Sequence, residues 1–563
     1  MAEKEGFEPS IPFWGIHDFQ SCALGQLRDF SINQSAAISL FILHYLRPFV
    51  KHEFKFFYLF DKIQKFLTFK HTQMVAFATV QCYNSLNFVP GGVPMSDKHA
   101  PAQKHSFFLP KKSSSVNMTE GSILKHILSF AIPVLVGSLF QQLYNMVDTW
   151  VVGNYVSNEA FSAVGSVGPI INTLIGFFTG LASGAGVVIS QNYGAKRYDE
   201  VSKAVHTAVT MTALLGILFT FLGIFLVPLM LRLMNTPEEV MPAATEYLQI
   251  YFAGILGLML YNIGAGILRA VGDSTRPFYF LIISALMNIC LDLLFVLVFR
   301  MGVAGVAWAT IISQGVSALL VMITLARSNE CVKLSLRKLT LHWNSLKRIV
   351  GVGLPASIQM AITAFSNIFV QSYINYFGPD FMSGWAAYTK TDQLLLLPVQ
   401  AIALSMSTFV GQNLGAGAVD RAKKGINRGI LMTLVSTAVL MTPIMLFPRS
   451  IVAFFNAKPE VIDYGSMLLL WLSPFYLLTS FNQVYVGALR GAGNTRIPTL
   501  ISLCSFVVIR QIYLFVVSRV CNEALLIGLS YPFGWIFNTL LTTIYYHRTN
   551  LLKTRVVEDK PQE

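Results

Sequence analysis

Charged residues are scarce in this chain. They make up 12% of its 563 residues, whereas about a quarter of a typical soluble domain is charged. Hydrophobic residues make up 54%, and the mean hydropathy is +0.57. This composition excludes an ordinary soluble domain and indicates an all-α integral membrane protein, since helices satisfy their own backbone within lipid.

Patterns of catalytic and metal-binding residues are also missing. The six cysteines are scattered singly, without a CxxC pair or a metal-ligand spacing. The glycine-rich stretches 184–187 and 491–493 lack the lysine of a phosphate-binding loop. We therefore predict that the chain is not an enzyme and has no cofactor. The net charge of +13 does not indicate a nucleic-acid partner, because the basic residues cluster in short loops between apolar segments.

Residues 1–117 differ from the remainder. They hold six of the ten histidines and no apolar run of about 20 residues. Residues 3–12 resemble the translation of a conserved arm of a tRNA gene. We predict that 1–117 is a start-site artefact outside the family-like part, with translation beginning at Met118. The alternative is a disordered or surface-associated cytoplasmic extension.

Twelve apolar segments follow Met118, each close to the length that a helix needs to cross a bilayer. They lie at about 127–152, 161–189, 205–231, 243–268, 277–299, 303–326, 349–376, 384–410, 429–447, 463–489, 498–518 and 523–546. The loops on the N-terminal side of these spans hold 22 lysines and arginines, and the opposite loops hold five. The positive-inside rule then predicts that both termini are cytoplasmic.

An internal repeat organises the twelve spans. Residues 190–195 (SQNYGA) match residues 411–416 (GQNLGA), 221 positions later, and residues 268–277 answer residues 489–498 at the same spacing. Each half has an even number of spans, so both halves enter the membrane from the same side and form a parallel repeat. The sequence predicts two six-helix lobes around a central cavity, with rocking of the lobes alternating access.

The predicted organisation has four parts after the first 117 residues. They are an N-terminal lobe at 118–326, a cytoplasmic connector at 327–348, a C-terminal lobe at 349–548 and a cytoplasmic tail at 549–563.

Two acidic residues lie in apolar spans of the first lobe. Asp148 is near the end of the first span, where it would either face the protein interior or reach the headgroups. Asp292 is deep in the fifth span, and Asn288 shares its helix face because the two are four residues apart. Charged groups within lipid usually mark a transport pathway, so we expect the two acids to come together.

From Met118 to about Lys553 the chain resembles the MATE (multidrug and toxic compound extrusion) family. The resemblance is carried by IP-x14-D-x-W in the first span, by QN-x-GA and LR-x-x-G-x-(S)TR-P in both halves, by N-x3-D at 288–292 and by GVAGVAWAT at 302–310. Because acids lie deep in spans of the first lobe, the sequence is most similar to the bacterial DinF-like branch. The resemblance implies a cation site at Asp148, Asn288, Asp292 and Thr310.

The expected function is a cation-coupled antiporter that exports lipophilic, often cationic, organic compounds. H⁺ or Na⁺ would discharge the two acids, with no other metal, and the first helix would then bend at Pro133, which lacks a backbone donor. The predicted substrate contacts are Gln141, Tyr144, Tyr247, Tyr251 and Asn262, since aromatic faces attract organic cations.

The sequence leaves two other functions open: a flippase for a lipid-linked precursor and an integral membrane enzyme. The flippase is the main alternative, although a strongly basic cavity for pyrophosphate is not evident. Lys390, Asp392 and Arg510 lie within the second half and have no assigned role. We expect small organic substrates and membrane lipids as partners, no nucleic acid, a monomer, and a multi-pass position in the bacterial inner membrane.

Overall fold

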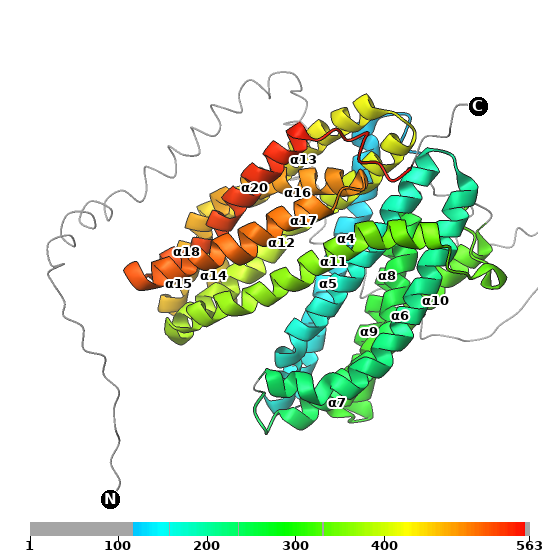
Figure 1. The fold of residues 1–563 in the computed structure, drawn as a ribbon. Helices are drawn as coiled ribbons and strands as arrows, with labels where there is room; N and C mark the ends of the chain where they lie inside the picture. The colour runs from blue at the N-terminus through cyan, green and yellow to red at the C-terminus, as the bar shows by residue number, and fades with distance from the viewer. Residues whose placement is uncertain (1–115, 157, 235, 329–330, 558–563) are drawn as a thin grey trace, which may run out of the picture. The chain divides into compact units, whose positions relative to one another are not determined.

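The computed structural model describes residues 116–156, 158–234, 236–328 and 331–557, and within these residues the regular elements are helical (Figure 1). The predicted artefact at 1–117 lies outside the described residues except for its last two positions. The first half contains α4 (Ile123–Tyr155), α5 (Asn158–Gly194), α6 (Tyr198–Leu233), α7 (Met241–Ala253), α8 (Ile255–Ala270), α9 (Thr275–Leu293), η1 (Leu294–Val298) and α10 (Gly302–Arg327).

The second half follows the same plan after a short turn, η2 (Leu336–Lys338). It contains α11 (Trp343–Asn375), α12 (Gly378–Gly415), α13 (Val419–Leu446), α14 (Pro448–Phe455), α15 (Pro459–Leu472), η3 (Ser473–Phe475), α16 (Tyr476–Gly491), α17 (Arg496–Leu503), η4 (Cys504–Ile509), α18 (Arg510–Val520), α19 (Ala524–Gly528) and α20 (Ser530–Arg548).

Twelve membrane spans are present in the described residues. Eleven are helices long and apolar enough to cross a bilayer, and the twelfth is the pair α7 and α8, which meet at a bend of 47°. Gly254 lies at this bend, where a Cβ would collide with the side chain of Ile311 in α10. The corresponding span of the second half is interrupted by the 3₁₀ turn η3, which contains Pro474. The predicted fold class, twelve helices in two six-helix lobes, is confirmed.

Several helices are longer than the predicted spans. α4 has 33 residues, α5 has 37 and α12 has 38. α11 begins at Trp343, inside the segment predicted as a connector. Hydropathy locates the apolar part of a span, whereas the backbone hydrogen bonds of a helix continue through its polar ends. The short helix α14 was not predicted. It begins at Pro448, just after α13 ends, and proline is favoured in the first turn of a helix.

The two lobes meet along long helices. α5 of the first lobe packs on α11 and α12 of the second, and α4 packs on α12 as well as on α9 of its own lobe. The α5–α11 contact is close because of glycine: a Cβ at Gly184 would lie 2.5 Å from the backbone of Gly353 and Ile349. These contacts bring the backbones of the lobes together at this crossing.

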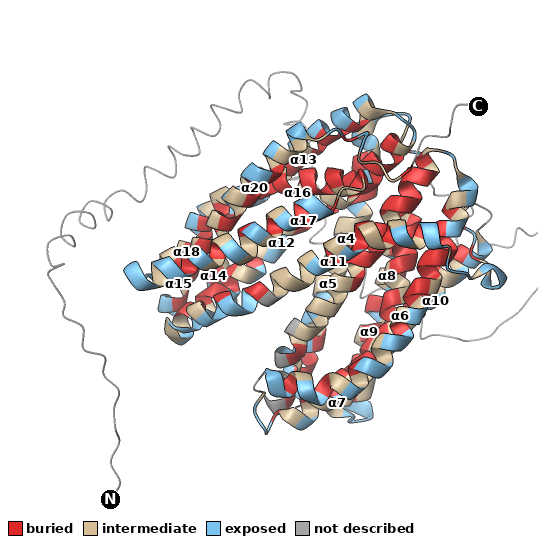
Figure 2. Cartoon of the chain, in the orientation of Figure 1, coloured by how far each residue is buried: buried red, intermediate tan, exposed pale blue. Residues whose placement is uncertain are grey.

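Large apolar side chains cover the outer faces of the helices. Phe225 is 79% exposed and Phe454 is 83% exposed. Figure 2 shows buried residues on the helix faces that meet one another and exposed residues on the outward faces. So much exposed apolar surface is typical of contact with lipid.

Two segments that flank the helical region pack against the helices. We call residues 116–121, ahead of α4, the first strap, and residues 551–557, after α20, the second strap. Met118 in the first strap is 1% exposed, and Leu551 and Val557 in the second are each 4% exposed. The predicted tail therefore packs on the protein over its described part, and residues 558–563 lie outside the described residues.

Candidate functional site

The first lobe brings its two acids together. Asp148 is near the end of α4 and Asp292 is in the last turn of α9, and these two helices pack against each other. The two carboxyl groups lie close enough for their charges to interact, and Asp292 is fully buried. The α-helix gives way to the π-helical turn η1 directly after Leu293, and such turns are frequent at functional sites.

The acids lack hydrogen-bond donors. Among the described residues, Oδ1 of Asp148 and both carboxylate oxygens of Asp292 are buried without a donor. Two carboxylates can only accept hydrogen bonds, so their contact with each other supplies none unless one of them carries a proton. Two adjacent negative charges away from water are strongly unfavourable, so the pair favours a shared proton or a bound monovalent cation.

Asn288 and Thr310 add oxygen atoms beside the pair. Asn288 lies one turn before Asp292, is 1% exposed, and has no hydrogen-bond partner for its amide atoms in the described part of the chain. Thr310 in α10 donates its hydroxyl to the Val306 carbonyl at 2.9 Å, which leaves the hydroxyl oxygen able to accept. Carboxylate, amide and hydroxyl oxygens are suitable ligands for a small hard cation such as Na⁺.

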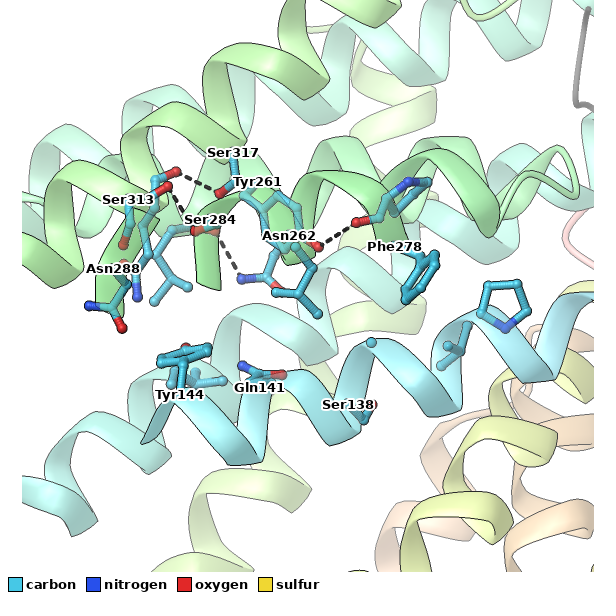
Figure 3. A pocket seen from close by; sticks show the side chains of 18 of the residues that line it. Ser138, Gln141, Tyr144, Tyr261, Asn262, Phe278, Ser284, Asn288, Ser313 and Ser317 are labelled. Carbon is cyan, nitrogen blue, oxygen red and sulfur yellow. Dashed lines mark hydrogen bonds between the residues drawn. The ribbon is translucent and has the colours of Figure 1, made fainter. Parts of the chain in front are cut away.

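A cavity of about 130 Å³, lined by both polar and apolar side chains, adjoins this group inside the first lobe. It lies between α4 on one side and α8, α9 and α10 on the other (Figure 3). Asn288 and Thr310 line it, as do Arg269 and Ser274. Pockets for drug-sized ligands are typically 300–1,000 Å³, so this cavity is of a size for water and ions.

The structure separates the predicted substrate residues into two sets. Gln141, Tyr144 and Asn262 line the cavity, and Figure 3 shows the first two on α4 facing the opposite helices. Tyr247 and Tyr251 do not line it. Their rings stack with centroids 6.4 Å apart in the apolar core of the first lobe, with exposures of 6% and 3%.

Pro133 lies inside α4, which continues past it as a single helix. It also lines the cavity. Proline has no N–H to bond the carbonyl four residues earlier, so the helix is weakened at this point. The predicted bending of α4 stays a prediction.

The second lobe contains a polar cluster that the sequence did not resolve. The Tyr388 and Tyr476 hydroxyl groups are 2.9 Å apart, and Tyr476 lies within hydrogen-bonding reach of Asp392. Arg510, only 2% exposed, donates to Ser366 and Asn367 at 2.9 Å each. The sequence signal for this cluster was the presence of single charged residues within apolar spans.

The aromatic ring of Tyr531 completes this cluster, since the Arg510 guanidinium lies 5.0 Å from its centroid. Lys390, by contrast, is exposed. In the described part of the chain no group of three or more histidine, cysteine, aspartate or glutamate side chains is arranged to bind a metal ion.

Comparison with known proteins places these features in a family. The MatE family model matches residues 133–294 and again residues 355–516, once in each half. The chain belongs to the MatE family. It is 30% identical over 430 residues to the probable multidrug resistance protein YpnP of Bacillus subtilis, which covers 76% of this chain and 96% of YpnP. It is 24% identical over 392 residues to a FAD transporter of Shewanella oneidensis, covering 68% of this chain and 85% of the relative.

Solved structures of MatE-type transporters share the fold. A MOP superfamily transporter from Pyrococcus furiosus, described as having a binding pocket of reverse polarity, superposes with a TM-score of 0.73 and 22% identity, covering 78% of this chain and 98% of that one. A MATE structure in a bent conformation has a TM-score of 0.72 and 23% identity, with 79% and 99% coverage.

The comparisons confirm the predicted MatE membership and the multi-pass membrane fold. The chain belongs to a family of multidrug efflux transporters and is not an enzyme. The relatives do not favour the flippase. The DinF-like branch stays a prediction.

Proposed function

We propose that this MatE protein is an antiporter that exchanges H⁺ or Na⁺ for lipophilic, often cationic, organic compounds. The observation that supports this is the contact between Asp148 and Asp292, whose buried oxygens lack donors. A purely structural polar cluster is expected to satisfy its own hydrogen bonds. This pair instead gains most when it takes up a positive charge.

The cavity in the first lobe provides a route for the ion. Water and ions can enter it past the polar residues that line it, and Asn288 and Thr310 stand where the cavity meets the acids. We assign Gln141, Tyr144 and Asn262 to this route, because the cavity is too small for a drug-sized substrate. Tyr247 and Tyr251 pack in the core around the acid pair.

The helix α4 can carry the effect of ion uptake to the other lobe. It holds Asp148, packs on α9 beside Asp292, and also packs on α12 of the second lobe, where Ser405 donates to the Ile127 carbonyl at 3.4 Å. Neutralising the pair removes the repulsion between α4 and α9. Bending of α4 at Pro133 would then alter the contact with α12 and change the space between the lobes.

The remaining parts of the proposal concern location and assembly. We place the protein in the bacterial inner membrane as a monomer, with both termini cytoplasmic because the basic loops lie on that side. Reporter fusions after α10 and after α20 test the orientation. An active phosphatase reporter, which needs the periplasm, at either position would contradict it.

Transport by the full chain in liposomes tests the function. Liposomes are loaded with ethidium, and a pH gradient or a Na⁺ gradient is imposed separately. We expect one gradient to drive ethidium movement. Asp148→Asn and Asp292→Asn are each expected to reduce this movement to the rate in liposomes without protein. Asp392→Asn is the matched control, because it removes a carboxylate from a span of the second lobe.

Two outcomes would contradict the proposal. One is the absence of gradient-driven movement of any lipophilic cation tested. The other is undiminished movement in both first-lobe variants. FAD serves as an anionic comparison, since a relative transports it, and we expect no ion-driven FAD movement here.

A further inference from the structure

Two glutamines of the repeated QN-x-GA motif cross between the lobes in a reciprocal way. Gln191 of α5 donates its Nε2 to the Gly491 carbonyl of α16 at 2.8 Å. Gln412 of α12 donates its Nε2 to the Ala270 carbonyl of α8 at 2.9 Å. The donors are 221 positions apart, and so are the acceptors. Both side chains are 0% exposed, so each bond links the lobes away from water.

The other end of each glutamine side chain is held by a strap. Oε1 of Gln191 accepts the Val556 N–H at 2.7 Å and the Val557 N–H at 3.3 Å, both from the second strap. Oε1 of Gln412 accepts the Met118 N–H at 3.0 Å from the first strap. Each strap therefore fixes the orientation of one amide, so that its Nε2 faces the other lobe.

Glycines allow this close approach. A Cβ at Gly194 would collide with the backbone oxygen of Gln412, and a Cβ at Gly415 would collide with the backbone oxygen of Gln191. The turns after α8 and α16 show the same symmetry under the straps. Gly272 and Gly493, with φ of +90° and +88°, leave no room for a side chain because the first and second strap respectively cover them.

We propose that Gln191 and Gln412 form a reciprocal lock that holds the lobes together at the strap end of the transport path. The lock opens when the lobes separate there. The glutamines are positioning residues, and the straps hold them in the locked orientation. This inference rests on the proposed transport by rocking lobes.

The chemistry of the lock suits a contact that must break and re-form. Its hydrogen bonds join uncharged amides and carbonyls, and when the lobes part, water replaces the lost partners at low net cost. Removing the side-chain amide shifts the balance toward separated lobes, because the opposite carbonyl then has its partner only in the open, hydrated state.

A single reporter cysteine measures the separation directly. Ser190 is 1% exposed and lies against Gly411 of the other lobe. Ser190→Cys is placed in the full chain after the six native cysteines are replaced by alanine, and its rate of maleimide labelling is measured in nanodiscs without substrate or gradient. We expect Gln191→Leu and Gln412→Leu each to raise the rate about tenfold.

The same motif supplies a matched control. Asn192 is also buried, but its Nδ2 donates to the Val188 carbonyl of its own helix at 2.8 Å. Asn192→Leu is expected to leave the labelling rate within about twofold of the parent, since no bond between the lobes is lost. Equal rates in Asn192→Leu and in the two glutamine variants would overturn the lock.

The strap contribution is tested without altering either glutamine. Val556→Pro removes the shorter of the two N–H bonds to Gln191 Oε1, whereas Val556→Ala retains it. We expect faster labelling in Val556→Pro only. If the glutamine variants fail to fold, this pair decides the question, and equal rates in the two would reject the role of the strap. Because the labelling needs neither a substrate nor an ion gradient, failure of the antiport proposal in liposomes leaves this result interpretable.

Discussion

The two lobes share a helix plan but differ in how their buried charges are satisfied. The first lobe holds Asp148 and Asp292 in contact, with no donor for three of their oxygens among the described residues. The second lobe holds Asp392 beside Tyr476, and Arg510 with donor bonds to Ser366 and Asn367. The two contacting charges in the first lobe are therefore both negative, whereas the cluster in the second lobe has one charge of each sign.

This difference indicates which lobe responds to an ion and which lobe stays constant. A lobe whose buried acids lack partners changes its interactions when an ion arrives, and so it can couple an ion gradient to movement. A lobe that already holds one buried charge of each sign gains little from an added ion, although Oδ1 of Asp392 and Nε of Arg510 lack hydrogen-bond partners among the described residues. We infer that the second lobe is the more constant framework during the cycle, although it was built from the same repeat.

The largest expected effect concerns the pH dependence of substrate binding. If H⁺ is the coupling ion, protonation of the first-lobe acids opposes binding of a cationic substrate, so affinity falls as pH falls. The slope is at most about tenfold per pH unit for one proton. Fluorescence polarisation of ethidium from pH 8 to pH 6 measures it.

The comparison of the lobes then depends on which acid carries this slope. Asp292→Asn is expected to flatten the dependence, and Asp392→Asn to retain it. A flattened profile in Asp392→Asn alone would reverse the roles of the lobes. If Na⁺ is the coupling ion, the same contrast is expected along a Na⁺ titration at fixed pH.

A smaller effect is expected where the lobes cross. Gly184→Ala places a methyl group against the backbone of α11, and such overpacking costs about 1–3 kcal/mol. Ser405, its repeat counterpart in α12, already has a Cβ, so Ser405→Ala should change stability by less than about 1 kcal/mol. Thermal unfolding in detergent compares them, and equal losses would mean that the two crossings are equally tight.

The smallest effect concerns the second-lobe cluster. Tyr476→Phe removes the 2.9 Å hydroxyl contact with Tyr388 and the contact with Asp392, at a cost of about 1–2 kcal/mol. Tyr247→Phe in the first-lobe core is the comparison variant, although the two tyrosines are not related by the repeat. Its expected loss of unfolding free energy is below about 0.5 kcal/mol. The midpoints of thermal unfolding measure both. A larger loss in Tyr247→Phe would show that the first lobe relies on its tyrosine hydroxyls.

Hydropathy predicted the spans because a membrane span is defined by its composition. The repeat predicted the lobes because the order of the spans along the chain is the same in both halves. The spacing of Asn288 and Asp292 placed them on one helix face, and the family resemblance added Asp148 and Thr310. The partners of Arg510 could not be predicted, since Ser366 and Asn367 lie more than 140 positions away.

The lock was missed for a related reason. The sequence marked QN-x-GA as a repeated loop motif, but a glutamine that donates to a backbone carbonyl leaves no complementary side chain to recognise at the acceptor. Only the fold brings Gly491 to Gln191 and Ala270 to Gln412. Contacts to backbone atoms are in general invisible to residue patterns.

The two straps have a consequence for the ancestry of the molecule. Duplication of a six-helix unit copies each glutamine and its neighbouring turn, so it creates two equivalent seats at the seam. The first strap precedes the first unit and the second strap follows the last. Two segments of different sequence therefore bind the two equivalent glutamines. A mutation in one strap therefore alters the contact of only one glutamine. In the same way, a protein fused next to one strap affects only one of the two contacts between the lobes.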